Sequence, residues 1–251
     1  MRRDAQAVLL LLVGGTLLKI SLAGTYVRYV KAGQLPLLLA AGVVLVAVAL
    51  VTLIAELRAR STVDDHAVDD HAVDDHAADD HDHHHGESKV GWLLVVPALA
   101  LLLFAPPAVG AFQANRNGTA LSAQADTDYP PLPAGDPVTI SLLDYAGRAV
   151  FDHGNSLAGR TVRLTGFIIP GAGGHPYLAR MIVACCAADA RPVKVGLTGE
   201  VPVGLKQEQW VQVTGTWLDQ ADHDAVNNEL IPYVEVSSLE EIAAPDNQYE
   251  S

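Results

Sequence analysis

The sequence lacks the short motifs that mark most enzymes and many zinc-binding folds. Only two of its 251 residues are cysteines, and because they are adjacent there is no Cys-x-x-Cys pair of the kind found in structural zinc sites and redox motifs. A phosphate-binding glycine loop, a His-Glu-x-x-His pair and a nucleophile motif are also absent. These absences favour a non-enzymatic role.

Positively charged residues are scarce. The chain has 16 lysines and arginines against 29 aspartates and glutamates, which gives a formal net charge of −13. Acidic groups outnumber basic ones both in residues 61–89 and from residue 90 onward. An acidic surface repels phosphate backbones and attracts cations, so we expect no nucleic-acid partner.

Hydrophobic residues make up 50% of the chain and are concentrated in three runs. The runs cover about 5–24, 35–55 and 90–110, each close to the roughly 20 residues that span a hydrocarbon core. We predict two transmembrane helices within residues 1–60 and a third at 90–110. The open alternatives are a cleaved signal sequence for the first run and, because of its prolines, a re-entrant hairpin for the third.

The positive residues that flank these runs indicate the orientation. With the N-terminus inside and three crossings, the cytoplasmic side receives more of them than the outside does. We therefore expect a multi-pass protein of the cell (plasma) membrane, with its N-terminus and residues 61–89 in the cytoplasm and its C-terminal domain extracytoplasmic. If residues 90–110 did not cross, that domain would be inside. The inside set is Arg2, Arg3, Arg58, Arg60 and Lys89; the outside set is Arg28, Lys31 and Arg116.

Residues 61–89 form a His/Asp-rich tract built on tandem copies of a five-residue unit, the first being Val63-Asp-Asp-His-Ala. Its imidazoles and carboxylates are a ligand set suited to zinc. A five-residue period turns by about 140° per copy on a helix and alternates sides in an extended chain, so neither geometry builds one tetrahedral site. We expect a disordered loop that binds metal weakly, or else a solvated acidic linker. The histidines are His66, His71, His76, His81, His83, His84 and His85.

The rest of the chain predicts an extended tether and a small β domain. Residues 111–137 are rich in polar residues and proline, as in a tether. Residues 138–251 combine a helical period with several alternating runs, which predicts an OB-like antiparallel β-barrel or another small antiparallel fold. The fold class is therefore an α+β membrane protein. We expect a helix at 141–152 and strands at 160–169, 177–187, 193–197, 210–217 and 233–239.

The adjacent cysteines, Cys185 and Cys186, fall near the end of the expected strand 177–187. Neighbours in a regular strand point to opposite faces, so the two thiols converge only if a bulge or the strand end intervenes. Three interpretations stay open: a metal or thiol site with Asp189 and His175, a vicinal disulfide, or two small buried hydrophobic residues. In the first, Zn²⁺ is the ion we would expect.

Several segments together resemble the YcgQ-like family of permease subunits, membrane proteins with no assigned function. The resemblance covers nearly the whole chain, and its most specific part is Cys-Cys-Ala-Ala-Asp-Ala. It implies a multispanning permease as partner and a link to metal supply. The segments are Ser21-Leu-Ala-Gly-Thr-Tyr-Val-Arg-Tyr-Val, His81-Asp-His-His-His-Gly-Glu, Phe104-Ala-Pro-Pro, Ala179-Arg-Met-Ile-Val-Ala-Cys-Cys-Ala-Ala-Asp-Ala and Trp210-Val-Gln-Val-Thr-Gly.

The sequence thus predicts a non-enzymatic, membrane-anchored accessory subunit of a permease that handles a divalent metal such as zinc. Two alternatives from other classes remain. The first is an envelope redox or metal-dependent enzyme that uses Cys185 and Cys186. The second is an interaction module whose barrel docks a partner by shape alone.

Overall fold

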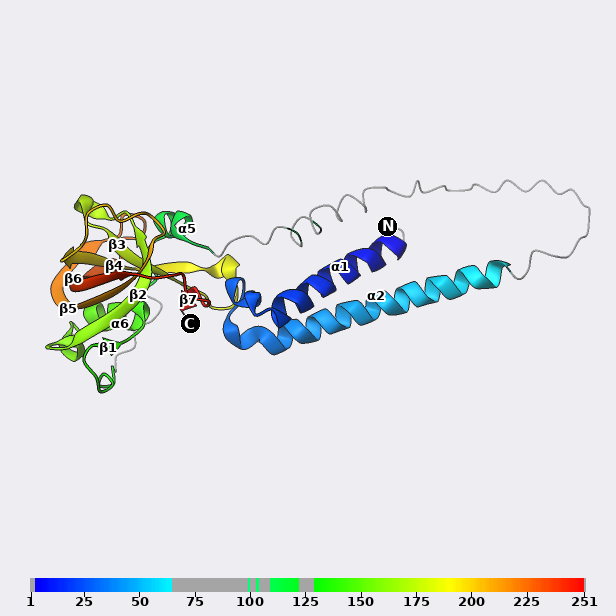
Figure 1. Cartoon of the computed structure of the whole chain (residues 1–251), viewed down its shortest axis with the longest axis horizontal. Helices are drawn as coiled ribbons and strands as arrows, with labels where there is room; N and C mark the ends of the chain where they lie inside the picture. Colours follow the sequence, from blue (N-terminus) through cyan, green and yellow to red (C-terminus); the bar gives the residue numbers. More distant parts are fainter. Residues whose placement is uncertain (1–2, 65–98, 100–102, 104–108, 122–128, 251) are drawn as a thin grey trace, which may run out of the picture. The chain divides into compact units, whose positions relative to one another are not determined.

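The computed structural model describes residues 3–64, 99, 103, 109–121 and 129–250. Its first elements are two apolar helices, α1 (Arg3–Leu22) and α2 (Leu35–Asp64), separated by the 3-10 turns η1 (Thr25–Arg28) and η2 (Ala32–Gln34) (Figure 1). Helices form in both of the first two predicted runs, and α2 continues beyond its predicted end. Most of the His/Asp tract and of the third predicted span lies outside the described residues.

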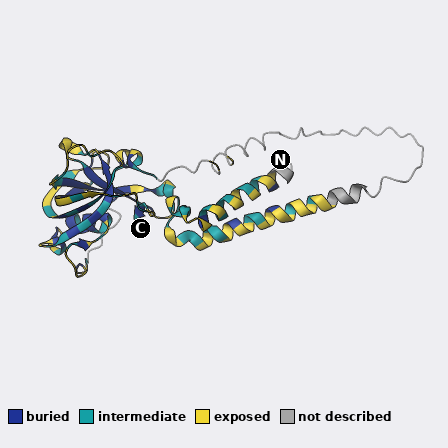
Figure 2. Ribbon diagram, viewed as in Figure 1, coloured by how far each residue is buried: buried dark blue, intermediate teal, exposed yellow. Residues whose placement is uncertain are grey.

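Two glycines allow α1 and α2 to approach each other closely. A Cβ atom added at Gly14 would lie 3.0 Å from the Cβ of Leu45, and one added at Gly42 would lie 2.9 Å from the Leu18 side chain. Small residues at a helix crossing serve this purpose in membrane proteins. Among the described helices, one segment, Ala32–Arg58, is long and apolar enough to cross a membrane, and much of α2 is exposed (Figure 2).

The chain divides into two compact units. One contains Met1–Tyr26 and Gly33–Pro106, and the other contains Val27–Ala32 and Pro107–Ser251. The segment Val27–Ala32 therefore belongs with the β domain, although it connects α1 to α2 in the sequence.

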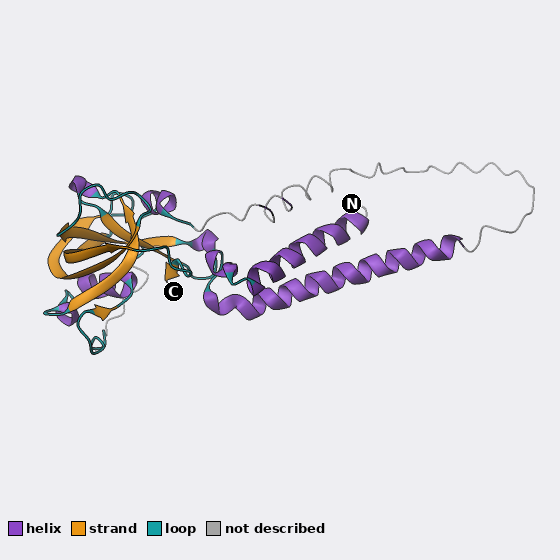
Figure 3. Cartoon of the chain, in the orientation of Figure 1, coloured by secondary structure: helices purple, strands orange, loops and turns teal. Residues whose placement is uncertain are grey.

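A closed five-stranded barrel forms the centre of the second unit (Figure 3). Its strands follow the order β2, β5, β6, β4, β3, and pairing of β3 with β2 closes it. Every pair around the barrel is antiparallel except β4 with β6, which corrects the expectation of a purely antiparallel barrel. The strands are β2 (Thr161–Ile169), β3 (Tyr177–Ile182), β4 (Arg191–Gly199), β5 (Trp210–His223) and β6 (Leu230–Glu241), with short β1 (Val138–Thr139) and β7 (Tyr249–Glu250) outside the ring.

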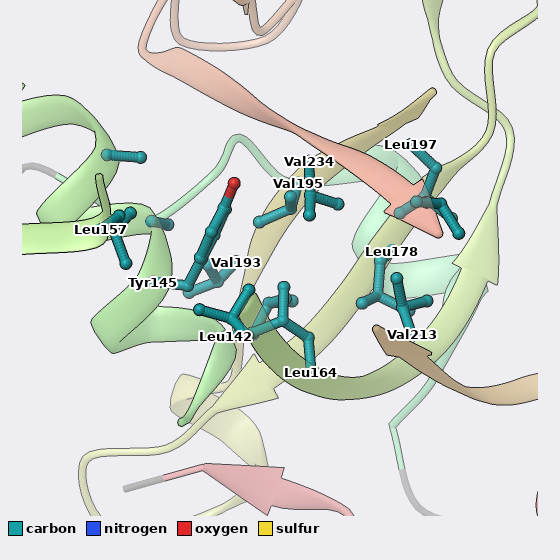
Figure 4. Packing of buried hydrophobic residues seen from close by; sticks show 14 of the residues in the cluster. Leu142, Tyr145, Leu157, Leu164, Leu178, Val193, Val195, Leu197, Val213 and Val234 are labelled. Atoms are coloured by element: carbon teal, nitrogen blue, oxygen red, sulfur yellow. The ribbon is translucent and has the colours of Figure 1, made fainter. Parts of the chain in front are cut away.

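Helix α6 (Leu142–Phe151) packs against the barrel and closes its main core (Figure 4). The helix begins where Ser141 accepts a hydrogen bond from the backbone N–H of Asp144, an ordinary N-cap. Its buried side chains repeat at helical spacing, as the sequence predicted. Tyr145 is fully buried and its hydroxyl donates to the carbonyl of Tyr233 at 2.7 Å.

Part of the expected tether, residues 111–137, packs against the barrel. It starts with the short helix α5 (Ala111–Arg116), and the following Thr119 is fully buried. Beneath it, the ammonium group of Lys194 lies 2.8 Å from Asp224 Oδ2, with both side chains almost inaccessible to solvent. The backbone N–H of Thr119 also donates to Asp224. This buried ion pair fastens the segment to β4, a role that the sequence pattern did not indicate.

Candidate metal centre

The two cysteines lie in a loop after β3, because the strand ends at Ile182 and not at residue 187 as predicted. Cys186 is the N-cap of the 3-10 turn η6 (Ala187–Asp189). Its sulfur accepts a hydrogen bond from the Asp189 backbone, and the Asp189 carboxylate accepts one from the Cys186 backbone. This reciprocal pattern is a capping box in which Cys replaces the usual Ser or Thr. The three-residue spacing from Cys186 to Asp189 is therefore what permits this cap.

The turn brings Cys185, Cys186 and Asp189 together, and we call them the Cys2Asp group. Their potential ligand atoms all lie within 4.8 Å of one another. The two sulfurs are 3.7 Å apart. Two sulfurs bound to one zinc at about 2.3 Å and at a tetrahedral angle lie about 3.8 Å apart. The thiols are thus already at the separation that a shared tetrahedral zinc requires.

The carboxylate of Asp189 is held in place by the loop backbone. Its oxygens accept hydrogen bonds from the N–H groups of Ala184 at 2.9 Å, Cys185 at 2.8 Å and Cys186 at 3.2 Å. The Cys185 thiol donates to the same carboxylate at 2.9 Å. A metal that displaced this thiol proton would find the carboxylate already oriented. The Sγ–Oδ2 separation would have to widen to about 3.5 Å for tetrahedral zinc, which requires only a small shift of an exposed side chain.

Hydrogen bonding shifts the pKa values of the Cys2Asp group in opposite directions. The bond from the Cys185 thiol to Asp189, followed by its contact with Cys186, raises the pKa of Cys185 to about 11. The same thiol and the loop N–H groups lower the pKa of Asp189 to about 2. At neutral pH the group therefore holds a protonated thiol beside a carboxylate. Reactive redox cysteines have a lowered pKa instead, so this arrangement disfavours a nucleophilic role, and a metal would have to displace the thiol proton to bind.

We predict slow alkylation of Cys185 at neutral pH. With a pKa of about 11, only about one thiol in 10⁴ is ionised at pH 7, and the thiolate is the reacting species. In a Cys186→Ser variant, the iodoacetamide reaction at Cys185 should accelerate about tenfold per pH unit and continue to rise above pH 9. Mass spectrometry of the Cys185 peptide measures this rate. A rate that levels off near pH 8.5, as for an ordinary cysteine, would contradict the prediction.

The structure does not bring His175 into the Cys2Asp group. His175 precedes β3 and the cysteines follow it, so the six-residue strand, about 20 Å long, separates them. Its ring instead meets the ring of Tyr233 edge-on, with centroids 6.4 Å apart, and lines a cavity of about 410 Å³. The histidines of the His/Asp tract (His66, His71, His76, His81, His83, His84 and His85) lie outside the described residues.

Arg180, near the cysteines in sequence, does not pair with Asp189. It is buried, its guanidinium donates to the carbonyl of Asn247 at 2.8 Å, and it lies over the ring of Trp210 at 5.0 Å. The sequence, with Arg180 beside the cysteines and near Asp189, predicts a surface ion pair, and this prediction is wrong. Arg180 holds the C-terminal segment against the barrel.

Another segment of the protein borders the cysteine loop, and no sequence pattern indicates it. We call residues Tyr29–Lys31 the docking strand. The N–H of Lys31 donates to the carbonyl of Cys185 at 3.1 Å, and the N–H of Ala187 donates to the carbonyl of Tyr29 at 2.7 Å. Both bonds involve only backbone atoms, so side-chain patterns do not reveal them.

Two family models match the chain. The DUF1980 N-terminal domain matches residues 5–120, and the DUF1980 C-terminal domain matches residues 145–250. The chain belongs to the DUF1980 family. The N-terminal DUF1980 match includes the docking strand, and the C-terminal match includes the whole Cys2Asp group. Neither description names an activity, so the functional argument depends on the geometry of the site. Comparisons with curated proteins and with solved structures gave no match.

Proposed function

We propose that this DUF1980 protein is a membrane-anchored accessory subunit whose barrel binds a divalent metal, with zinc as the best fit. The observation that carries the proposal is the convergence of two thiols and a fixed carboxylate, with ligand atoms within 4.8 Å. Three protein ligands leave the fourth position of a tetrahedral zinc open. An open position on an exposed loop permits transfer of the ion, which suits delivery or capture better than a purely structural role.

The proposed membrane anchor is the pair α1 and α2. Ala32–Arg58 has the length and composition of a membrane span, and Gly14 and Gly42 give the two helices the close contact typical of membrane pairs. The chain's resemblance to YcgQ-like permease subunits supports a multispanning permease as the partner. The barrel's strand order, with one parallel pair, supports an OB-like classification.

The docking strand supports the proposed topology. Because it belongs to the barrel unit and joins α1 to α2, the turn between the helices and the barrel would lie on the same side of the membrane. The end of α2 at Asp64 would then be on the opposite side. The flanking charges favour an extracytoplasmic location for the barrel.

Zinc titration of the protein in lipid nanodiscs tests the metal proposal. To remove weak sites, the titration uses a variant that lacks residues 63–85. We expect one tightly bound zinc per chain, its loss in Cys185→Ser/Cys186→Ser, and full retention in the control His175→Ala. Absence of zinc from the deletion variant, or unchanged binding after both serine substitutions, would refute the proposal.

A further inference from the structure

Two sets of contacts hold the docking strand, one to the cysteine loop and one to Tyr249 through the preceding residue, Arg28. Val30 lies opposite Cys186 in an antiparallel bridge, between the two backbone hydrogen bonds to the cysteine loop. On its other side, the buried hydroxyl of Tyr249 donates to the carbonyl of Arg28 at 2.9 Å. The same hydroxyl accepts from the N–H of Val109 at 3.0 Å.

These contacts use the same short loop that carries the metal ligands. The carbonyl bound by Lys31 belongs to Cys185, and the N–H that reaches Tyr29 belongs to Ala187, next to Cys186. Any adjustment of the loop backbone on metal binding therefore moves the atoms that hold the strand. Conversely, the docked strand limits the conformations of the loop before a metal arrives, which lowers the entropic cost of binding.

We propose that metal occupancy and docking of Tyr29–Lys31 are thermodynamically coupled, so that the barrel reports its metal state to the α1–α2 turn. This inference rests on the proposed metal-binding function. The coupling must be reciprocal: metal strengthens docking by the same factor by which docking strengthens metal binding. The strand connects directly to η1 and η2, so its release or capture reaches the ends of α1 and α2 through a few residues.

A substitution that removes one backbone donor tests the coupling. Lys31→Pro eliminates the N–H that bonds to Cys185, whereas the matched control Lys31→Ala keeps it. Both substitutions are made in the variant that lacks residues 63–85, and each protein is reconstituted in nanodiscs. We expect zinc affinity to fall about tenfold in Lys31→Pro and to stay unchanged in Lys31→Ala. In the parent protein, in which Lys31 is unchanged, zinc should slow hydrogen exchange at the amides of Lys31 and Ala187.

The outcomes separate this inference from the proposed function. If the parent binds zinc and Lys31→Pro binds it equally well, or if zinc leaves both amides unchanged, the coupling is wrong while the metal site stands. If the parent binds no zinc, the proposed function fails and the coupling fails with it.

Docking itself has a test that needs no metal. Antiparallel residues that face each other without mutual hydrogen bonds have Cα atoms about 4.5 Å apart, within the range for a disulfide. Val30→Cys in a Cys185→Ser background should therefore form a disulfide with Cys186 under mild oxidation in membranes. The matched control Gly33→Cys should not. Equal crosslinking of both variants, or none with Val30→Cys, would overturn the docking arrangement.

Discussion

Replacing Asp189 by Asn is expected to lower zinc affinity and raise the reactivity of Cys185 at the same time. The amide keeps one oxygen for the N–H groups of Cys185 and Cys186 and loses the acceptor for Ala184, so the capping bond of the turn should persist. It removes the charge that would bind the metal and that holds the Cys185 thiol protonated. Zinc affinity should fall by at least the roughly 10–100-fold that loss of a supporting residue costs. Alkylation of Cys185 at pH 7 should become tens of times faster.

A fall in zinc affinity together with a rise in the alkylation rate of Cys185 distinguishes a metal ligand from a residue that only caps the turn. Asp219→Asn makes the same charge change at a position away from the Cys2Asp group, on β5. It is the matched control and should alter neither property. Zinc titration and thiol alkylation on the same preparation provide both readings. If Asp189→Asn left zinc affinity intact, Asp189 would be only a capping residue of η6.

Replacing Lys194 by Met is expected to reduce the free energy of unfolding of the barrel by about 3–5 kcal/mol, because it leaves Asp224 charged and buried without its partner. Hydrogen exchange of the β4 amides measures this loss. The exposed Lys206→Met is the control and should stay within about 0.5 kcal/mol of the parent.

A second substitution and a change of pH test whether the broken ion pair causes the loss of stability in Lys194→Met. Lys194→Met/Asp224→Asn removes both charges and keeps an acceptor for Thr119, so it should be more stable than Lys194→Met alone. Burial alone would raise the pKa of Asp224, but the hydrogen bonds from Lys194, Val226 and Thr119 outweigh it and lower that pKa. The carboxylate therefore stabilises the parent above its usual pKa, and this stability is lost as the pH falls. The deficit of Lys194→Met should shrink in acid; a constant deficit would contradict the ion-pair explanation.

Local patterns were sufficient to predict the main elements of the barrel. The helical spacing around Tyr145 predicted α6, and the alternation within 160–169 predicted β2 almost to the residue. Composition alone predicted the helices α1 and α2. In each of these cases, the residues of the element itself are enough to predict its secondary structure.

The sequence could not predict contacts between distant segments. In β4, Lys194 alternates with Val193 and Val195, a pattern typical of a solvent-facing residue. It is buried because residues 117–121 cover that face. The docking strand could not be predicted either, because its hydrogen bonds to the cysteine loop are made by backbone atoms, which are the same in every sequence.

The candidate site was predicted in part. The type and spacing of Cys185, Cys186 and Asp189 predict a shared site if the strand ends near the two thiols. What decided their convergence was the capping box of η6, which shortens β3. His175 was grouped with them by chemistry alone, and the length of β3 places it at the other end of the strand.

Cobalt binding to the full-length chain tests the central claim most directly. Co²⁺ replaces zinc readily, and a bond to thiolate produces a strong sulfur-to-metal charge-transfer absorption that histidine and aspartate ligands cannot give. The His/Asp tract therefore does not interfere, and no deletion is needed. Binding by the Cys2Asp group predicts this band at about one Co²⁺ per chain and its disappearance in Cys185→Ser/Cys186→Ser. A cobalt-loaded parent whose spectrum matches that of the double serine variant would contradict the metal centre.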